Sequence, residues 1–592
     1  MRCIKVVAKY NCITLNIKNG EIEYFDKLRQ PEQNILKNGN VVYIYRGTKS
    51  KKIYIGQTKH FIERNKQHYN GKEQKFNIAA FDQVSILISS YFNGSALDDV
   101  ESQLITNFIA DNPKSKSQLV QYDNDEVINR NNGNSVNDYR EREKVALEVI
   151  LPFWEKELYP NGWVSTPTLK ELRRGALVKY SPIKQLTDEQ VALLKEINSN
   201  SDKSFVINGD AGTGKTVLLT HLVAMLLNEQ PNKRIAVVLQ PNWITTAKDI
   251  FRVYGMNSNN LTIATSTQLI NANNNYDVVI VDESHKLSRK FSKQMASFNE
   301  VYQGRFVNDN NHLNCLKKMG GQIVLMYDVL QAIRPANITR TDFNDATINF
   351  EKRYLKTQFR IQAPKGKNYT SDDFMNGIKY LLYKDTGLLE ETNFDPQFDK
   401  SIFHDSELDS YFGYFETEPL MNLIDWVEED NNFNPEHVNR ILGGLVEPWK
   451  QAHGKDPSIT HWHEGDIKRR WNSTQENWIY SDDEDAEEQI GSVFAVQGID
   501  LNKVGVLIGN DLQVDAEGRL YGEPKNFHNV NGKFSKKDDN PDNPYEFTLF
   551  VLNIYYILMT RGIDGVRIGF WKNESFKEYM KKTLEIDYLI TS

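Results

Sequence analysis

An eight-residue segment beginning at Gly209 limits the architectures open to this chain. It reads Gly-Asp-Ala-Gly-Thr-Gly-Lys-Thr and matches the pattern GxxxxGK[ST], between an apolar run, FVIN, and a helix-like apolar run, VLLTHLVAMLL. The pattern predicts a strand, a loop and a helix, because Gly212 and Gly214 allow backbone N–H groups to curl around phosphate oxygens. Lys215 is expected to reach the β- and γ-phosphates of ATP, and Thr216 to bind Mg²⁺.

A second polar site follows an apolar strand at residues 277–281. The strand ends in two acids, and the first of them, Asp282, lies 66 residues beyond Thr216, after one further strand and helix. We expect Asp282 to hold Mg²⁺, directly or through water, and Glu283 to polarise the water that attacks the γ-phosphate. Together the two segments predict a site that hydrolyses ATP.

Short apolar runs recur from about residue 181 onward, separated by helical patterns. They fall into one group before residue 335 and another after residue 490. Continuous Val/Ile/Leu runs that alternate with helices are typical of a parallel sheet covered on both faces. The pattern therefore predicts an α/β fold with tandem parallel-sheet cores. The runs are FVING, IAVVLQ, DVVIVDE, QIVLMYD, VGVLIGND and VRIGFW.

Further motifs resemble those of superfamily 1 helicase-type ATPases, and within them the Schlafen-like DNA/RNA helicase domain. The resemblance covers residues 181–592, about two-thirds of the chain, and includes VNRILGGLVEPWK, which is similar to the Schlafen-like Arg-then-small-residue signature. The motif residues are Gln190 in LTDEQ, VLQPN at 238–242, ATSTQ at 264–268, Gln331 in DVLQ, Arg360 in QFR, Gln497 and Gly498 in VQGID, and Arg561 in TRG.

This resemblance implies two RecA-like lobes of an ATP-driven motor that grips nucleic acid. Gln190 would read the adenine, Gln331 would relay the state of the γ-phosphate, and Gln497-Gly498 would also contact the nucleotide. Arg360 and Arg561 would come from the second lobe. An arginine supplied in this way can stabilise charge on the transferring phosphate when the lobes close.

The N-terminal part of the chain carries a second group of chemistry-bearing residues. Residues 41–75 hold nine Lys/Arg against two Glu, which fits contact with phosphate, although a solvated lysine-rich surface has the same composition. Val41-Val42-Tyr43 and Tyr54-Ile55-Gly56 resemble the two signature strands of the GIY-YIG endonuclease family, with Val-Val in place of Gly-Ile. The expected α/β fold thus begins with a small mixed α/β nuclease-like domain.

The spacing that follows also resembles this family. Arg64 lies ten residues beyond Tyr54, His68 follows four residues later, and Glu101 lies in a helical stretch. One carboxylate can hold a single Mg²⁺, with Mn²⁺ as the alternative ion, and an arginine can neutralise charge on the scissile phosphate. The resemblance implies Tyr43 as general base, supported by Tyr54 and His68, and a further asparagine within Asn129–Asn134.

The sequence is expected to divide into five parts. They are an N-terminal strand-like segment (1–39), a GIY-YIG-like domain (40–135), a helical linker (136–180), an ATP-binding lobe (181–340) and a second lobe with inserted segments (341–592).

Composition limits the cellular compartment in which the protein is expected. No stretch of about 18 apolar residues is present, so we expect no membrane span, and the N-terminal segment MRCIKVVAKYNCITLNIKNG has no apolar core long enough for a signal peptide. Three cysteines without a CxxC pair exclude a disulfide framework and a cysteine-rich zinc site, and they indicate a reducing cytoplasm. A net charge of −8 argues against a passive nucleic-acid coat.

These features predict a cytoplasmic helicase or translocase coupled to a Mg²⁺-dependent endonuclease, acting in defence against foreign DNA or in DNA repair. DNA is the favoured nucleic acid and RNA the alternative, and a protein partner or a homo-oligomer stays open. The competing hypothesis is an ATPase switch whose N-terminal module binds without cutting.

Two further groups of residues are expected to be structural. The segment His461-Trp-His463-Glu464 lacks a second ligand cluster at the spacing of a metal site, so we expect it to be solvated or packed. Trp462, Trp471 and Trp478 are expected in a core rather than stacked on bases.

Overall fold

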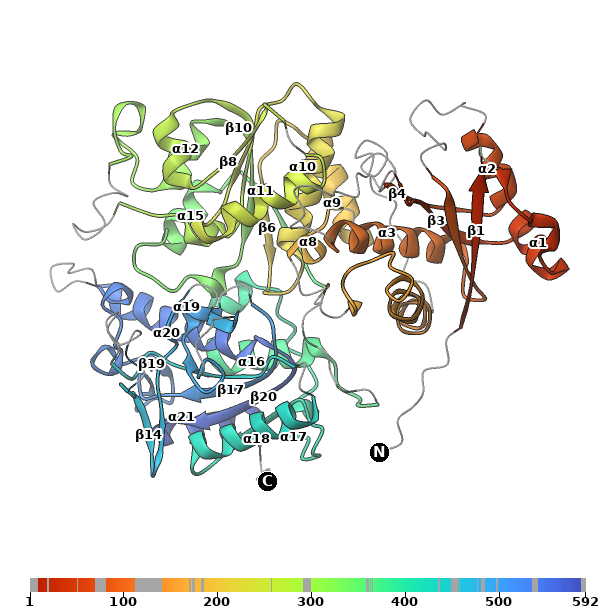
Figure 1. Ribbon diagram of the computed structural model, residues 1–592. Coiled ribbons are helices and arrows are strands. Elements are labelled where there is room, and N and C mark those ends of the chain that lie inside the picture. Colours follow the sequence, from red (N-terminus) through yellow and green to blue (C-terminus); the bar gives the residue numbers. More distant parts are fainter. Residues whose placement is uncertain are drawn as a thin grey trace. The chain divides into compact units, whose positions relative to one another are not determined.

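A computed structural model gives the architecture of the protein (Figure 1). Its contacts divide the chain into two compact units, one formed by Met1–Ser201, Thr216–Ala236 and Trp243–Ile263, the other by the remaining segments. The structure describes residues 9–18, 21–49, 52–69, 81–111, 141–169, 172, 176–182, 186–256, 258–290, 300–357, 361, 364, 366–434, 437–448, 456, 458–475, 478–480, 485–496, 499–534 and 541–586.

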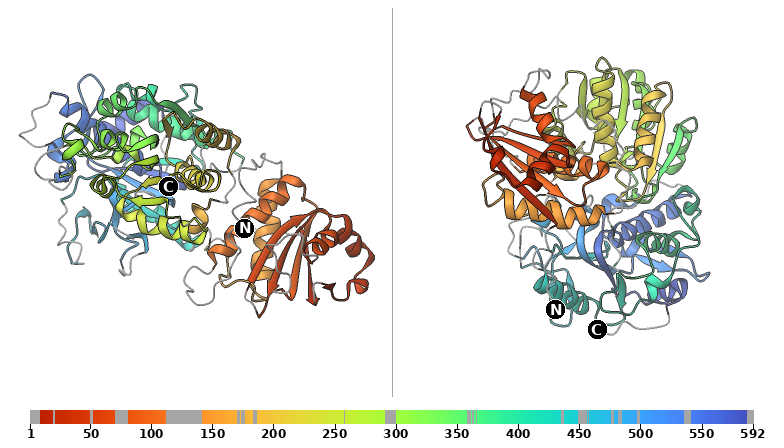
Figure 2. Two further views of the ribbon diagram at one scale, coloured as in Figure 1. Left: turned by 90° about the horizontal axis from the view of Figure 1, so that it is seen from above. Right: turned by 90° about the vertical axis from the view of Figure 1, so that its right-hand side faces the viewer.

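The first unit contains a five-stranded antiparallel sheet with strand order β2-β1-β5-β3-β4, drawn in red in Figure 2. Strand β3 lies between β5 and β4, and Tyr43 and Tyr45 of β3 lie opposite Gly56 and Tyr54 of β4. Residues across from each other in a ladder share one face of the sheet. The strands are β1 (Tyr10–Lys18), β2 (Glu21–Ile22), β3 (Val41–Gly47), β4 (Lys52–Thr58) and β5 (Gln83–Ser89).

Strand β1 belongs to the same sheet as β3 and β4, so the expected boundary after residue 39 falls between elements of one sheet. The segment 21–39 also contains a helix, α1, which short apolar alternation did not indicate; Pro31 in its first turn is a residue that favours helix starts. The described helices of this unit include α1 (Gln30–Asn38), α2 (Phe61–Tyr69), α3 (Gly94–Ala110), α8 (Ala176–Lys179), α9 (Asp188–Ser199) and α11 (Ile244–Val253).

The helical linker expected at residues 136–180 contains a helical run over residues 142–158. It consists of α5 (Arg142–Val145), α6 (Leu151–Phe153) and two π-helical turns, Ala146–Ile150 and Trp154–Leu158. The indole of Trp154 packs edge-on against Phe108 of α3, with 5.4 Å between the ring centres. At the end of α3, the Asp111 carboxylate accepts hydrogen bonds from the backbone N–H groups of Ser165 and Thr166.

A six-stranded sheet carries the GxxxxGK[ST] segment and has strand order β11-β6-β10-β9-β7-β8. Strand β6 pairs in parallel with β10 and β11, and β10 pairs in parallel with β9. The strands are β6 (Phe205–Gly209), β7 (Ile235–Val238), β8 (Leu261–Ala264), β9 (Tyr276–Val281), β10 (Gly320–Tyr327) and β11 (Glu351–Leu355), and α10 (Lys215–Glu229) follows β6.

A second parallel sheet has strand order β12-β20-β17-β13-β16. Figure 1 shows α18 on one face of this sheet and α20 on the other. The strands are β12 (Phe412–Phe415), β13 (Arg440–Gly443), β16 (Ile490–Gly491), β17 (Leu501–Ile508) and β20 (Gly562–Phe570), beside the hairpins β14 (Trp462–Glu464)–β15 (Ile467–Arg469) and β18 (Leu512–Val514)–β19 (Leu520–Gly522).

The predicted α/β fold class is confirmed: a small mixed α/β domain precedes two parallel-sheet, RecA-like lobes. The helices of the second unit are α12 (Ser266–Ala272), α14 (His312–Lys317), α15 (Arg340–Ala346), α16 (Ser371–Tyr383), α17 (Ser401–His404), α18 (Pro419–Phe433), α19 (Val493–Val496), α20 (Asn543–Met559) and α21 (Glu574–Leu584).

The three tryptophans expected in a core are buried. Trp462 packs edge-on against Trp471 and Trp571, with 4.8 and 5.1 Å between ring centres, and Trp478 is fully buried. His461 accepts a hydrogen bond from the Trp471 backbone N–H. Among the described residues, no group of three or more His, Cys, Asp or Glu side chains is placed to hold a metal ion.

Candidate active sites

The phosphate loop begins where β6 ends. Gly212 and Gly214 have φ values of 89° and 82°, a left-handed backbone that side chains disfavour, so glycine is required at both positions. Helix α10 begins at Lys215, so the loop's backbone N–H groups lie at a helix N-terminus, where the dipole favours an anion. This is the strand–loop–helix context that the motif predicted.

The ammonium of Lys215 lies inside its own loop. It donates to the carbonyl oxygens of Gly209 at 2.5 Å and Asp210 at 2.9 Å, and it lies 3.6 Å from the Asp328 carboxylate. Asp328 also accepts a hydrogen bond at 2.6 Å from the side-chain amide of Gln331, so the two polar residues of the DVLQ segment are joined to the phosphate loop through Lys215.

Asp282 and Glu283 follow β9, and Ser284 fixes them by donating its hydroxyl to the carbonyl of Met326 on β10. Glu283 has φ 50° and ψ 47°, a left-handed conformation that costs free energy in a residue with a side chain and that recurs at functional sites. Its carboxylate pairs with His285 at 2.8 Å and Lys286 at 3.4 Å.

The two acids have opposite protonation tendencies. Burial, followed by the charge of Glu283, raises the pKa of Asp282 to about 7, against the opposing effect of Lys215 and Lys286. Burial also acts to raise the pKa of Glu283, but Lys286 and His285 outweigh it and hold that pKa well below its usual value. Of the two carboxyl groups, Glu283 is therefore the one whose surroundings favour the ionised form.

Three further residues expected at the ATP site, Gln190, Arg561 and Thr216, lie in the described part of the chain. Gln190 caps α9: its side-chain oxygen accepts from the Thr187 N–H, and its own N–H donates to the Thr187 hydroxyl. Arg561 is 1% exposed, and its guanidinium donates to the Ile499 carbonyl at 3.4 Å. Thr216 lies in the first turn of α10. Arg360, Gln497 and Gly498 lie outside the described residues.

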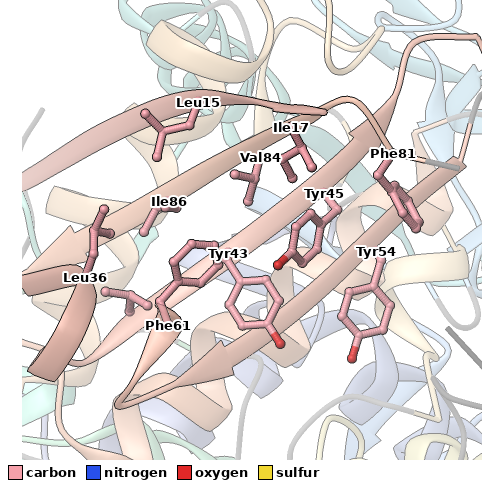
Figure 3. Close-up of a cluster of buried hydrophobic side chains, with 11 residues drawn as sticks. Leu15, Ile17, Leu36, Tyr43, Tyr45, Tyr54, Phe61, Phe81, Val84 and Ile86 are labelled. Carbon is pink, nitrogen blue, oxygen red and sulfur yellow. The ribbon is translucent and has the colours of Figure 1, made fainter. Parts of the chain in front are cut away.

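The N-terminal signature residues gather on one face of the antiparallel sheet. Tyr43, Tyr45 and Tyr54 lie side by side in Figure 3, and His68 of α2 approaches them, with its ring centre 6.2 Å from Tyr43 and 5.5 Å from Tyr54. The Tyr43 hydroxyl and His68 Nε2 share a hydrogen bond of 3.1 Å, and Tyr45 donates to Asn65 at 2.7 Å.

Gly56 makes room for Tyr43. A Cβ atom at position 56 would lie 2.5 Å from the hydroxyl oxygen of Tyr43, closer than any real contact. The glycine of the second signature is therefore needed for the position of the first signature's tyrosine. The Val41 side chain is fully buried in the same core as Leu36 and Phe61, so the departure from Gly-Ile fills a core position without moving Tyr43 off this face.

The remaining nuclease candidates lie on two helices. Arg64 precedes His68 by one turn of α2, and its guanidinium donates to Gln67 at 3.2 Å. Glu101 is buried in α3, a helix that packs against β3 and β4. The Gln57 side chain of β4 donates to Asp98 of α3 at 3.0 Å, which ties the two elements together. The Asn129–Asn134 candidates lie outside the described residues.

A family model of the Schlafen group 3, DNA/RNA helicase domain matches residues 202–572, more than half of the chain. The chain belongs to the Schlafen group 3 helicase family. A model of the GIY-YIG catalytic domain matches residues 39–113, which hold Tyr43, Gly56, His68 and Glu101. The fusion inferred from short motifs is thus confirmed for both parts.

One relative and two solved structures resemble this Schlafen group 3 protein. YPL245W, an uncharacterised protein of Saccharomyces cerevisiae, is 27% identical over 444 residues, 69% of this chain and 91% of the yeast protein. The DUF1998 helicase MrfA bound to DNA and AMPPNP has a TM-score of 0.31 at 9% identity, over 69% of this chain and 51% of its own. The Pyrococcus furiosus Hef helicase domain has a TM-score of 0.30 at 9% identity, over 69% of this chain and 99% of its own.

The match to this Schlafen group 3 protein spans about half the length of MrfA. In the described part of the chain, no helix is long and apolar enough to cross a membrane.

Sequence reasoning missed four residues of these sites. Asp328 begins the DVLQ segment, of which only Gln331 is expected at the site, and Tyr45 and Asn65 lie beside signature residues. The fourth, Lys379, pairs with the phosphate loop from 169 positions away. Its one sequence signal was a lysine on the apolar side of a helix, since Met375, Ile378 and Leu382 are buried with it.

Proposed function

We propose that this protein is an ATP-dependent helicase or translocase coupled to a Mg²⁺-dependent GIY-YIG-type endonuclease, with DNA as the favoured substrate. The observation that carries the proposal is the presence in one chain of two different phosphate-chemistry sites. One has Lys215, Asp328 and the ionised Glu283 around a phosphate loop; the other has Tyr43 hydrogen-bonded to His68 in a basic segment.

In the ATP site, the chain's own residues perform binding and orientation. Lys215 leaves the carbonyls of Gly209 and Asp210 to bind the β- and γ-phosphates, and Glu283 orients the attacking water. The oxygen ligands offered by Thr216 and Asp282 are of the kind Mg²⁺ prefers, and the ion would supply charge neutralisation on the phosphates. Arg360 and Arg561 are the proposed arginines of the second lobe.

In the nuclease site, Tyr43 passes its own phenolic proton to Nε2 of His68 along their hydrogen bond and accepts the proton of the attacking water in its place. Tyr54 supports this pair, and Arg64 neutralises charge that develops on the scissile phosphate. Glu101 offers the hard oxygen ligand that suits Mg²⁺ or Mn²⁺, which would act as a Lewis acid there. The asparagine expected within Asn129–Asn134 completes the proposed set.

The proposed setting is a reducing cytoplasm, in defence against foreign DNA or in DNA repair. Among the described residues, Cys12 and Cys315 are free thiols, which supports the compartment. A protein partner or a second copy of the chain remains part of the hypothesis.

A second candidate function has one observation in its favour. Val41 replaces the signature glycine and fills the core, as in a module kept for binding rather than cutting. In that case the protein is a nucleic-acid-sensing ATPase switch.

The test is to incubate the purified protein with Mg²⁺, with and without ATP, on labelled single- and double-stranded DNA and RNA. The proposal expects cleavage that stops on chelation of the metal and that is strongest on DNA. Strongest cleavage of RNA would make the protein an RNA-directed nuclease–helicase. Tight binding without cleavage of any substrate, in Mg²⁺ or Mn²⁺, would establish the switch instead.

A further inference from the structure

Helix α16 of the second lobe buries a lysine that the known motifs do not use. The Lys379 side chain is 1% exposed. Its ammonium lies 2.6 Å from Oδ2 of Asp210 and donates to the backbone carbonyl of Asn393 at 2.6 Å. An unpaired ammonium at this depth would be strongly unfavourable, so Asp210 and Lys379 have to be considered as one unit.

Asp210 is the second residue of the phosphate loop. Its carbonyl accepts a hydrogen bond from the Lys215 ammonium at 2.9 Å, while its carboxylate is held from the second lobe, by Lys379 of α16 and at 3.4 Å by the Tyr556 hydroxyl of α20. Its charge also acts on Asp328, the partner of Lys215: burial raises the pKa of Asp328, and the charge of Asp210 adds to that increase. The same residue therefore contacts both the ATP-binding lysine and the second lobe.

The negative charge of a carboxylate in a phosphate loop weakens ATP binding, because it repels the triphosphate. Asp210 can be tolerated there only if a cation neutralises it. The structure supplies that cation from α16 rather than from the loop itself.

We propose that Lys379 is a positioning residue of the ATP site. It neutralises and holds Asp210, so that the phosphate loop accepts ATP only while α16 of the second lobe is in place. This inference rests on the proposed ATPase function and adds to it a means by which the second lobe controls nucleotide affinity.

The experiment is a double-mutant cycle in the full-length protein that removes the charges of Lys379 and Asp210. Lys379→Met keeps the length of the side chain and leaves the Asp210 charge uncompensated, and we expect KM for ATP to rise about tenfold or more, with a smaller effect on kcat. Adding Asp210→Asn to the Lys379→Met variant should return KM toward the wild-type value, because it removes the charge that repels ATP. Lys379→Arg should resemble wild type.

Lys384→Met is the matched control. Lys384 caps the end of the same helix and donates to Thr583, away from the loop, so its loss should leave KM unchanged. Thermal melting of each variant verifies folding. If Lys379→Met does not fold, the double variant Lys379→Met/Asp210→Asn decides the question, because it leaves neither charge unpaired: its KM for ATP should be close to the wild-type value, and a KM raised about tenfold overturns the proposal.

The proposal is also overturned if Lys379→Met has a wild-type KM, or if the double variant is as defective as Lys379→Met, the result expected of a simple packing contact. Failure of the ATPase assignment gives a different result. In that case wild type does not hydrolyse ATP, or Lys215→Ala hydrolyses it as fast as wild type.

Discussion

At the scale of single residues, Glu283 combines an ionised carboxylate with a left-handed backbone. Glu283→Gln preserves the shape of the side chain and removes the charge that we propose orients water, so it should bind nucleotide normally and hydrolyse ATP at least about a hundredfold more slowly. Lys215→Ala should instead lose binding, because it removes the ammonium that contacts the phosphates. Steady-state ATPase rates and nucleotide-binding titrations distinguish the two defects. Near-wild-type hydrolysis in both variants would contradict the site.

Gly56 offers a test of the tyrosine cluster. The methyl group of Gly56→Ala would occupy the space of the Tyr43 hydroxyl, so the variant should break the Tyr43–His68 hydrogen bond and cut about tenfold more slowly or worse. Gly94→Ala is the matched control, because a Cβ atom at position 94 meets nothing within 4 Å. Equal cleavage by the two alanine variants would mean that Tyr43 does not act as base.

Asp511 makes stability depend on pH. Its carboxyl group is fully buried, accepts a hydrogen bond from Tyr555 and, among the described residues, has no partner for Oδ2. Burial raises its pKa from 3.8 to about 7. Below pH 3.8 the group is protonated in both folded and unfolded chains. As the pH rises toward 7, the unfolded chain loses its proton first, so this group's contribution to stability falls, and the loss is complete above the folded-state pKa.

Asp511→Asn removes this titration and keeps the oxygen that accepts from Tyr555. The variant should therefore melt on the order of a few degrees higher than wild type at about pH 8. The difference should shrink steadily as the pH is lowered toward 4, which thermal melting followed by circular dichroism measures. If Asp511→Asn melted at the wild-type temperature at every pH, ionisation of Asp511 would cost the folded protein no stability.

At the scale of elements, Arg561 lies at the junction between α20 and β20, and its guanidinium faces the Ile499 carbonyl. If this junction moves to deliver Arg561 to the γ-phosphate, nucleic acid should stimulate hydrolysis through it. Arg561→Ala should then keep ATP binding and lose the stimulation. Arg519→Ala, on the exposed β18–β19 hairpin, is the control. Stimulation that survives Arg561→Ala would assign the role to another arginine.

The elements show what local sequence could predict. The phosphate loop was predictable because the left-handed backbone at Gly212 and Gly214 requires glycine, and glycine is visible in a sequence. The tyrosine strands were predictable because β3 and β4 are neighbours in both sequence and space. Helix α1 was not, since short alternation and a helix face look alike over few residues.

The contacts of Lys379 and Asn553 could not be predicted from local pattern. Lys379 meets Asp210 across 169 positions, and Asn553 donates to the carbonyl of Ala332 across 221. Such pairs form only when distant parts of the chain pack together, and the spacing of residues within a short segment carries no information about that packing. The orientation of Arg561 is of the same kind, because its partner Ile499 lies 62 positions away.

At the scale of the whole molecule, the two proposed chemistries use separate residues. Glu101→Ala should abolish cleavage by removing the metal ligand, while ATP hydrolysis stays at the wild-type rate. Tyr43→Phe, which keeps the ring and loses only the hydroxyl, should cut poorly with metal binding retained. Calorimetric titration of Mn²⁺ alongside both activity assays measures each loss. Cleavage that survives Glu101→Ala would place the nuclease centre elsewhere in the chain.

The central claim is that one chain both moves along and cuts nucleic acid. The most direct measurement follows strand separation and cleavage together, on a labelled DNA duplex with a single-stranded overhang, in Mg²⁺ and ATP, for wild type, Lys215→Ala and Glu101→Ala. Wild type should do both, Lys215→Ala should lose separation, and Glu101→Ala should separate strands without cutting them. Wild-type protein that neither separates nor cuts this substrate or its RNA counterpart, or variants that retain both activities, would contradict the account.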